Sequence, residues 1–167
     1  DKGTPAHLQK LLSLSLQTDS VSQQHAYLNA MLTAKKIRKI NPSGNLQPVM
    51  QFLKIDIDTV WSKAVELAGL WKLESARLDL ETTLKQSEPK QVKKNAAINS
   101  LIAMGGEKTR KFFDEQIQNP QLSYSFKVTL IKGQMRIQPQ LAARRAVNLM
   151  GSIPKGEDRP GPSMRGE

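Results

Sequence analysis

The sequence has no cysteine, few aromatic residues and no long apolar run, and each of these absences narrows what the protein can be. Without cysteine, its 167 residues form no disulfide, no thiolate zinc site and no CxxCH haem attachment. Aromatic residues make up 5% of the chain, so the core must consist mainly of Leu, Ile, Ala and Met. No apolar stretch approaches the roughly 18–20 residues of a membrane span. This composition is typical of a soluble globular domain, either cytoplasmic or exported by a bacterium, and it does not fix the compartment.

Sequence motifs of catalysis are also missing. The chain has no HExxH, no GxSxG and no phosphate-binding glycine loop, and His7 and His25 fall on different predicted helices. Acidic residues such as Asp114 are interpreted as solvated helix faces. We therefore expect no enzyme activity, no cofactor and no metal site. The chain begins at Asp1 without a signal sequence, and we expect it to be a piece of a longer protein.

Acidic residues are absent from one long segment. The net charge is +10, but residues 58–118 are nearly balanced, with ten Lys/Arg against nine acids. Residues 119–150 contain five cations and no acid. The basic excess therefore lies at the two flanks of the folded part.

Helical periodicity dominates the rest of the sequence. Thr4 and Pro5 form an N-cap followed by a first-turn proline, and Gly105–Gly106 is a typical helix stop. The stretch LKIDIDTV alternates weakly, and a helix end plus linker is favoured over a strand. The pattern predicts helices over these ranges: 4–16, 19–40, 46–55, 58–73, 75–86, 89–104, 107–117, 123–137 and 138–150.

The helical pattern recurs. Lys63, Leu67 and Leu70 have counterparts further along the chain in Lys94, Ile98 and Leu101. One more step takes Ile98 to Ile131, whereas Leu101 is replaced by Gln134, which breaks the match. A weaker copy starts at Val21. Each unit is a pair of helices that cannot cover its own apolar face, so neighbouring units must stack.

The period of the recurrence, roughly 31–33 residues, falls within the range of helical repeat proteins. This period and the layout (K)xAxxxLxxL…AxxxL resemble HEAT repeats of the phycobilisome-lyase-like type over roughly residues 20–150. The resemblance implies an all-α, right-handed α-solenoid of about four helix pairs at 1–150, followed by a Gly/Pro-rich tail or linker at 151–167. A plain helical bundle is the alternative fold. The layout also resembles the HEAT segment of large planctomycete and verrucomicrobial proteins, in which propeller and c-type cytochrome domains flank such a segment.

Three lysines occupy one recurrent position: Lys63, Lys94 and Lys127. In HEAT repeats, a basic residue here commonly pairs with an acid of the same or an adjacent repeat. Asp58 and Glu88 are possible partners. An inter-repeat ladder is favoured over a basic face for an anionic ligand.

Two basic patches are candidate binding sites. The first ends the helix predicted over 19–40 and comprises Lys35, Lys36, Arg38 and Lys39, where cations also complement the helix dipole. The second lies in the acid-free segment and comprises Lys132, Arg136, Arg144 and Arg145. We expect the second patch to contact an acidic protein partner or a neighbouring domain, including the acids of the tail.

These observations favour a non-catalytic interaction or scaffold module, as a fragment or subunit of a larger assembly. The alternative is a basic HEAT-like module that binds nucleic acid, or a HEAT-like DNA glycosylase. A glycosylase would need an acid and aromatic residues in a basic groove, and the nearest combinations are Asp58 with Trp61 and Asp114 with Phe112. A lysine-lined groove without a carboxylate would favour binding.

Overall fold

The computed structural model describes residues 3–86 and 90–151, and this part of the chain is all-helical, with no strand. The predicted tail beyond residue 151 and the candidate partner Glu88 lie outside the described residues. The α-helices are α1 (Pro5–Gln17), α2 (Val21–Arg38), α3 (Asp58–Leu70), α4 (Arg77–Lys85), α5 (Gln91–Met104), α6 (Gly106–Gln118), α7 (Tyr124–Gln134) and α8 (Pro139–Gly151). Two 3-10 helices, η1 (Gln47–Lys54) and η2 (Glu74–Ala76), precede α3 and α4.

The local signals at the helix ends act as the sequence predicts. Thr4 caps α1 in a capping box, with its side chain accepting from the His7 N–H and the His7 ring accepting from the Thr4 N–H. Gly105 ends α5 at φ 68°, a conformation that favours glycine, and its N–H donates to the Leu101 carbonyl. The stretch LKIDIDTV forms the end of η1, a linker and the start of α3, as predicted.

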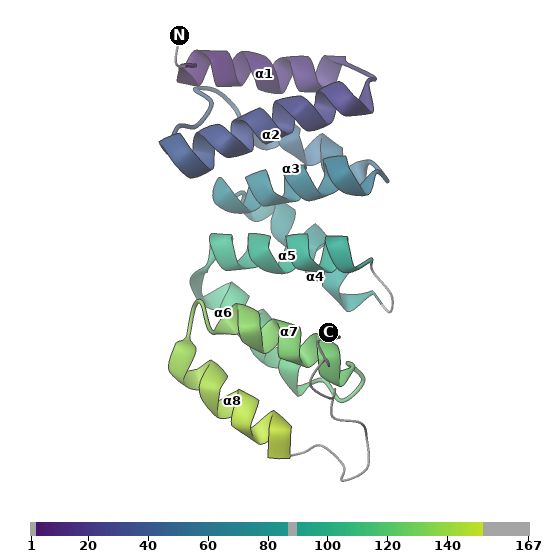
Figure 1. Ribbon diagram of the computed structural model, residues 1–167, viewed down its shortest axis with the longest axis vertical. Coiled ribbons are helices and arrows are strands. Elements are labelled where there is room, and N and C mark those ends of the chain that lie inside the picture. Colours follow the sequence, from purple (N-terminus) through teal and green to yellow (C-terminus); the bar gives the residue numbers. More distant parts are fainter. Residues whose placement is uncertain (1–2, 87–89, 152–167) are drawn as a thin grey trace, which may run out of the picture.

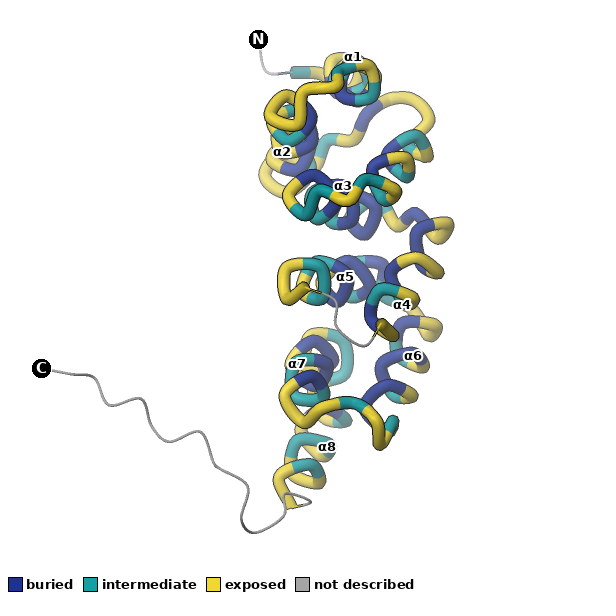
Figure 2. Tube along the Cα trace, turned by 90° about the vertical axis from the view of Figure 1, so that its right-hand side faces the viewer, coloured by how far each residue is buried: buried dark blue, intermediate teal, exposed yellow. Residues whose placement is uncertain are grey.

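The described helices are arranged along one long axis, from α1 at one end to α8 at the other (Figure 1). We call α1, α2, α3, α5 and α7 the front column, because each lies below the previous one in Figure 1, with α4 and α6 behind. Within this column α2 packs against α3, α3 against α5, and α5 against α7, while α4 packs on α5 and α6 on α7. Figure 2 shows buried residues gathered between the front column and the helices α4 and α6 behind it. Within the described residues, no helix is both long enough and apolar enough to cross a membrane.

The recurrent apolar positions form the core. Leu67, Ile98, Leu101, Phe113 and Ile131 are all buried, as their spacing predicts. Leu70, which the same pattern places in the core, is only partly buried. Leu70 is the last residue of α3, where fewer neighbours cover a side chain.

Helices α3 and α5 pack closely against each other at Gly69. Ser100 of α5 lies against Gly69 of α3, and its Oγ donates to the Val65 carbonyl at 2.6 Å. A methyl group added at Gly69 would meet Ser100 Oγ and would lie 2.6 Å from the Ser100 Cα. The two backbones can therefore approach this closely only because residue 69 has no side chain.

Arg77 of α4 connects α4 and α6 to the end of α5 through a chain of hydrogen bonds. Its buried guanidinium donates two hydrogen bonds to the Glu74 carboxylate and a third, at 2.9 Å, to Thr109 Oγ1 of α6. Thr109 in turn donates to the carbonyls of Leu101 and Gly105 at the end of α5. The hydrogen bonds from Arg77 lower the pKa of Glu74, so this contact favours the folded state above the ordinary glutamate pKa and weakens as the pH falls through the lowered value.

Gly69→Ala should destabilise the protein, although alanine is the better helix former by about 1 kcal/mol. The added methyl group must push α5 away from α3, and overpacking of this kind costs about 1–3 kcal/mol. Urea denaturation measures the change. Gly151→Ala is the matched control, because a methyl group there meets nothing within 4 Å. Equal stability of the two variants would contradict the close approach.

Leu101→Ala should lower the free energy of unfolding by about 2–5 kcal/mol, since Leu101 is fully buried and the change leaves a cavity. Urea denaturation again measures the change. Leu78→Ala, at an exposed leucine of α4, is the control and should have little effect. If Leu101→Ala lost no more stability than this surface control, the helical register would be wrong.

Candidate binding site between α5 and α7

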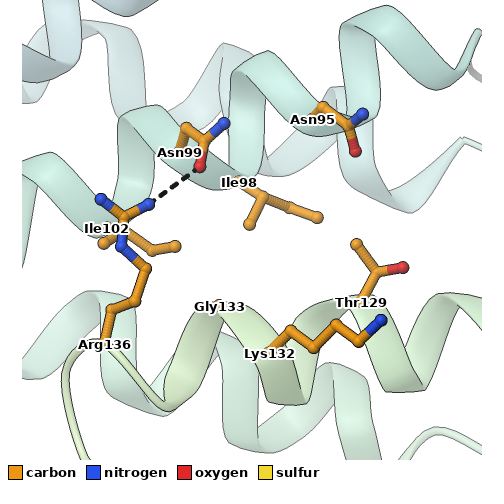
Figure 3. Close-up of a pocket in the computed structure, with 8 residues that line it drawn as sticks. All are labelled: Asn95, Ile98, Asn99, Ile102, Thr129, Lys132, Gly133 and Arg136. Atoms are coloured by element: carbon orange, nitrogen blue, oxygen red, sulfur yellow. Dashed lines mark hydrogen bonds between the residues drawn. The ribbon is translucent and has the colours of Figure 1, made fainter.

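A pocket of about 220 Å³ opens between α5 and α7. Its lining combines an apolar floor with a polar and basic rim, as Figure 3 shows. The lining residues are Asn95, Ile98, Asn99 and Ile102 from α5, Thr129, Lys132 and Gly133 from α7, and Arg136 just beyond α7.

Glycine keeps the floor of this pocket open. A methyl group at Gly133 would lie 3.0 Å from Ile102 Cδ1 and 3.1 Å from Ile98 Cγ2, which is tighter than ordinary van der Waals contact. Unlike Gly69, Gly133 faces the ends of flexible side chains and not a backbone. The helices therefore stand further apart at this level, and the floor is lined by isoleucine methyl groups.

Two asparagines one helical turn apart form the α5 side of the rim. Asn99 Oδ1 accepts a hydrogen bond of 3.1 Å from Arg136 Nη1, drawn in Figure 3, and Asn95 Oδ1 accepts one of 2.9 Å from Gln91. Both amide oxygens are thus engaged, while neither Nδ2 group has a partner among the described residues. On α7, the Thr129 hydroxyl donates to the Ser125 carbonyl.

The rim carries two cations that the chain does not neutralise. Lys132 is exposed and makes no hydrogen bond or ion pair within residues 3–86 and 90–151. Arg136 is exposed, and its one partner there is the neutral Asn99. No acid lines the pocket. The structure thus brings together half of the predicted C-terminal patch.

The other two residues of the predicted C-terminal patch, Arg144 and Arg145, lie in different surroundings. Arg144 is exposed on α8, beside Val147 and Asn148. Arg145 points inward and pairs with Asp114 of α6, and it also donates to Gln134 Oε1 of α7 at 3.0 Å. Arg145 therefore does not belong to an exposed patch, and Asp114 is not a solvated acid.

Gln134 explains the break in the repeat. It occupies the place of Leu101 and is equally buried, so the helical register continues through it. Its amide donates to Asp114 Oδ1 at 2.7 Å and accepts from Arg145. A buried amide with both ends satisfied is tolerated in a core. The resulting Asp114–Gln134–Arg145 cluster joins α6, α7 and α8.

The N-terminal basic patch is largely engaged within the chain. Lys36 pairs with Glu66 of α3, Arg38 donates to the Gly3 carbonyl at 2.8 Å, and the Lys39 ammonium donates to the Lys36 carbonyl at 2.7 Å. Lys35 is partly buried. Because the cations sit at the end of α2, these contacts fit a helix-capping role.

The recurrent lysines do not form the expected ladder with Asp58. Asp58 and Asp56 pair with Lys90 and Lys93 at the start of α5, and these lysines lower the pKa of both carboxyl groups. Lys94 instead lies over the Phe126 ring, 5.2 Å from its centroid. The other two members, Lys63 and Lys127, are partly buried and pair with no acid in the described part of the chain.

Five rim and floor residues were not singled out from the sequence: Asn95, Asn99, Ile102, Thr129 and Gly133. The sequence did contain a signal for Gly133. Three small residues, Gly69, Ser100 and Gly133, are separated by the same sequence intervals as the apolar positions of the repeat. Asn95 and Asn99, one helical turn apart, share an exposed helix face.

No protein-family model matches this chain, and no curated protein matches it either.

Arg145→Gln should loosen α8, because it removes the charged hydrogen bonds to Asp114 and Gln134. Such bonds contribute about 1.5–3 kcal/mol each. Amide hydrogen exchange should accelerate in α8 before it does in α3 or α5. Arg144→Gln, the exposed neighbour with the same charge change, is the control. Similar exchange in both variants would show that the cluster does not hold α8.

Proposed function

We propose that this chain is a non-catalytic protein-interaction module, a right-handed α-solenoid of HEAT-like helix pairs that belongs to a larger assembly. Its pocket between α5 and α7 holds an acidic protein partner. The observation that carries this proposal is the pair of cations, Lys132 and Arg136, at the rim of a pocket without a carboxylate. Unneutralised charge in a concave site attracts and orients a partner of opposite sign.

Ion pairs engage some of the cations of the described chain but not those at the rim of the pocket. In the described part of the chain, pairs occur from α2 to α8, and they engage Lys36, Arg77, Lys90, Lys93, Lys108 and Arg145. Lys132, Arg136 and Arg144 remain without an acidic partner there. Other cations of the described chain, such as Lys10 and Lys111, also lack an acidic partner, so Lys132 and Arg136 are distinguished by their position at the rim of the pocket.

The alternative of nucleic-acid binding or glycosylase chemistry has less support. The pocket is lined by neither a carboxylate nor an aromatic ring, whereas base stacking requires aromatic side chains. Asp58 and Asp114, the two acids considered for catalysis, are each paired with cations. Two rim cations suit a local acidic contact better than a phosphate backbone many charges long.

The test is to measure binding of poly-glutamate by the K132Q/R136Q variant. Loss of two favourable charges should weaken binding about tenfold at low salt, and raising the salt concentration should reduce the difference. The control variant K10Q/K111Q removes the same charge from exposed lysines of α1 and α6 and should bind nearly as the unchanged protein does.

Equal weakening of the two variants would show that only net charge matters, and would overturn the proposal. Tighter binding to a DNA duplex than to poly-glutamate, with the same loss in K132Q/R136Q, would favour the nucleic-acid alternative instead.

A further inference from the structure

We infer that the pocket between α5 and α7 receives a glutamate side chain of the acidic partner, with the carboxylate at the Lys132 and Arg136 rim and the methylene groups over the isoleucine floor. This inference rests on the proposed function and narrows it. It names the kind of side chain that the pocket selects, and it is argued from the size, floor and rim of the pocket.

The pocket is too large for a single small ion. A volume of about 220 Å³ corresponds to about seven water molecules at the roughly 30 Å³ that each occupies in the liquid. An isolated anion would leave most of this space filled with water. A side chain of several heavy atoms would displace a larger part of that water.

The floor is apolar, which favours a side chain with an aliphatic stem. Ile98 is almost fully buried, Ile102 is partly buried, and Gly133 lies between them without a side chain of its own. A glutamate has two methylene groups that would cover this floor, and an aspartate has one. Burial of one additional methylene corresponds to about a fourfold gain in affinity.

The rim offers chiefly hydrogen-bond donors, which favours a carboxylate over a neutral amide. Asn99 and Asn95 each accept one hydrogen bond through Oδ1 within the chain, while their two Nδ2 groups have no partner in the described part of it. The ammonium of Lys132 and the guanidinium of Arg136 are also donors. A carboxylate has only acceptors when ionised, whereas a glutamine would bring its own N–H2 group against these donors.

Asn99 has a positioning role in this arrangement. Its hydrogen bond draws the Arg136 side chain from the end of α7 across to α5, as Figure 3 shows. Arginine binds a carboxylate through a planar fork, so its orientation affects affinity more than its charge alone does. Loss of Asn99 should therefore weaken binding of glutamate while leaving the net charge unchanged.

The experiment compares four short Gly/Ser peptides of equal length that carry three glutamates, aspartates, glutamines or phosphoserines, each titrated into the full chain. Glutamate should bind about fourfold more tightly than aspartate, phosphoserine should not exceed glutamate, and glutamine should show no measurable binding. In ¹H–¹⁵N spectra, the side-chain amide signals of Asn95 and Asn99 should shift with the glutamate peptide.

Asn99→Ala should weaken binding of the glutamate peptide, because Arg136 loses the contact that orients it, and Asn29→Ala, at an exposed asparagine of α2, should not. Gly133→Ala, which narrows the floor, should remove the preference for glutamate over aspartate, and its circular dichroism spectrum and melting temperature would report whether it folds.

Equal affinity for glutamate, aspartate and phosphoserine, without shifts at Asn95 and Asn99, would overturn this inference. The proposed function would survive that result if K132Q/R136Q still weakened binding. Strongest binding of the phosphoserine peptide would also overturn it, in favour of a phosphate site. If K132Q/R136Q bound poly-glutamate as well as the unchanged protein does, the proposed function itself would fail.

Discussion

The contact between Gly69 and Ser100 sets the spacing on which the rest of the stack depends. A methyl group at residue 69 would lie 2.6 Å from the Ser100 Cα, so α3 and α5 approach as closely as their backbones allow. The Ser100 hydroxyl is then within 2.6 Å of the Val65 carbonyl, and the polar group is satisfied at the point of closest approach. One repeat later, Gly133 faces isoleucine side chains and not a backbone. The same recurrent position thus gives a closed contact between α3 and α5 and an open pocket between α5 and α7.

The C-terminal end of the stack contains both a charged pair that is engaged within the fold and exposed cations that have no acidic partner in the described residues. Gln134 replaces the apolar residue that the repeat calls for, and Asp114 and Arg145 satisfy its amide. A buried polar group of this kind is costly without partners, so Asp114 and Arg145 are required by the fold. Because residues 119–150 contain no acid, the one acid used here comes from α6. The remaining cations of that segment have no acid of their own segment to pair with, and two of them line the pocket.

Much of the fold could be predicted because its signals are local. Thr4 with Pro5 and Gly105 mark helix ends through backbone geometry, which depends on only a few neighbouring residues. The apolar positions that recur from one helix pair to the next predicted the core. The site was less predictable, because it depends on the distance between helices. Periodicity gave Lys132 and Arg136 one helix face, but Asn95 and Asn99 join them only through the packing of α7 beside α5, which no local signal specifies. The direction of Arg145 likewise depends on Asp114, which lies two helices earlier in the chain.

The hydrogen bonds within the chain decide which groups at the pocket rim are free to contact a ligand. An asparagine offers both a donor and an acceptor, so two asparagines and a threonine would by themselves suit almost any polar ligand. Here Arg136 and Gln91 take the amide oxygens, and Ser125 takes the threonine proton. The groups left without a partner are two amide N–H2 groups and the Lys132 ammonium, beside the Arg136 guanidinium and the partly engaged oxygens of the asparagines and the threonine, over a floor of isoleucine. Unpartnered donors and cations therefore outweigh free acceptors at the rim, and an acceptor-rich ligand with an aliphatic stem is the one that this surface complements.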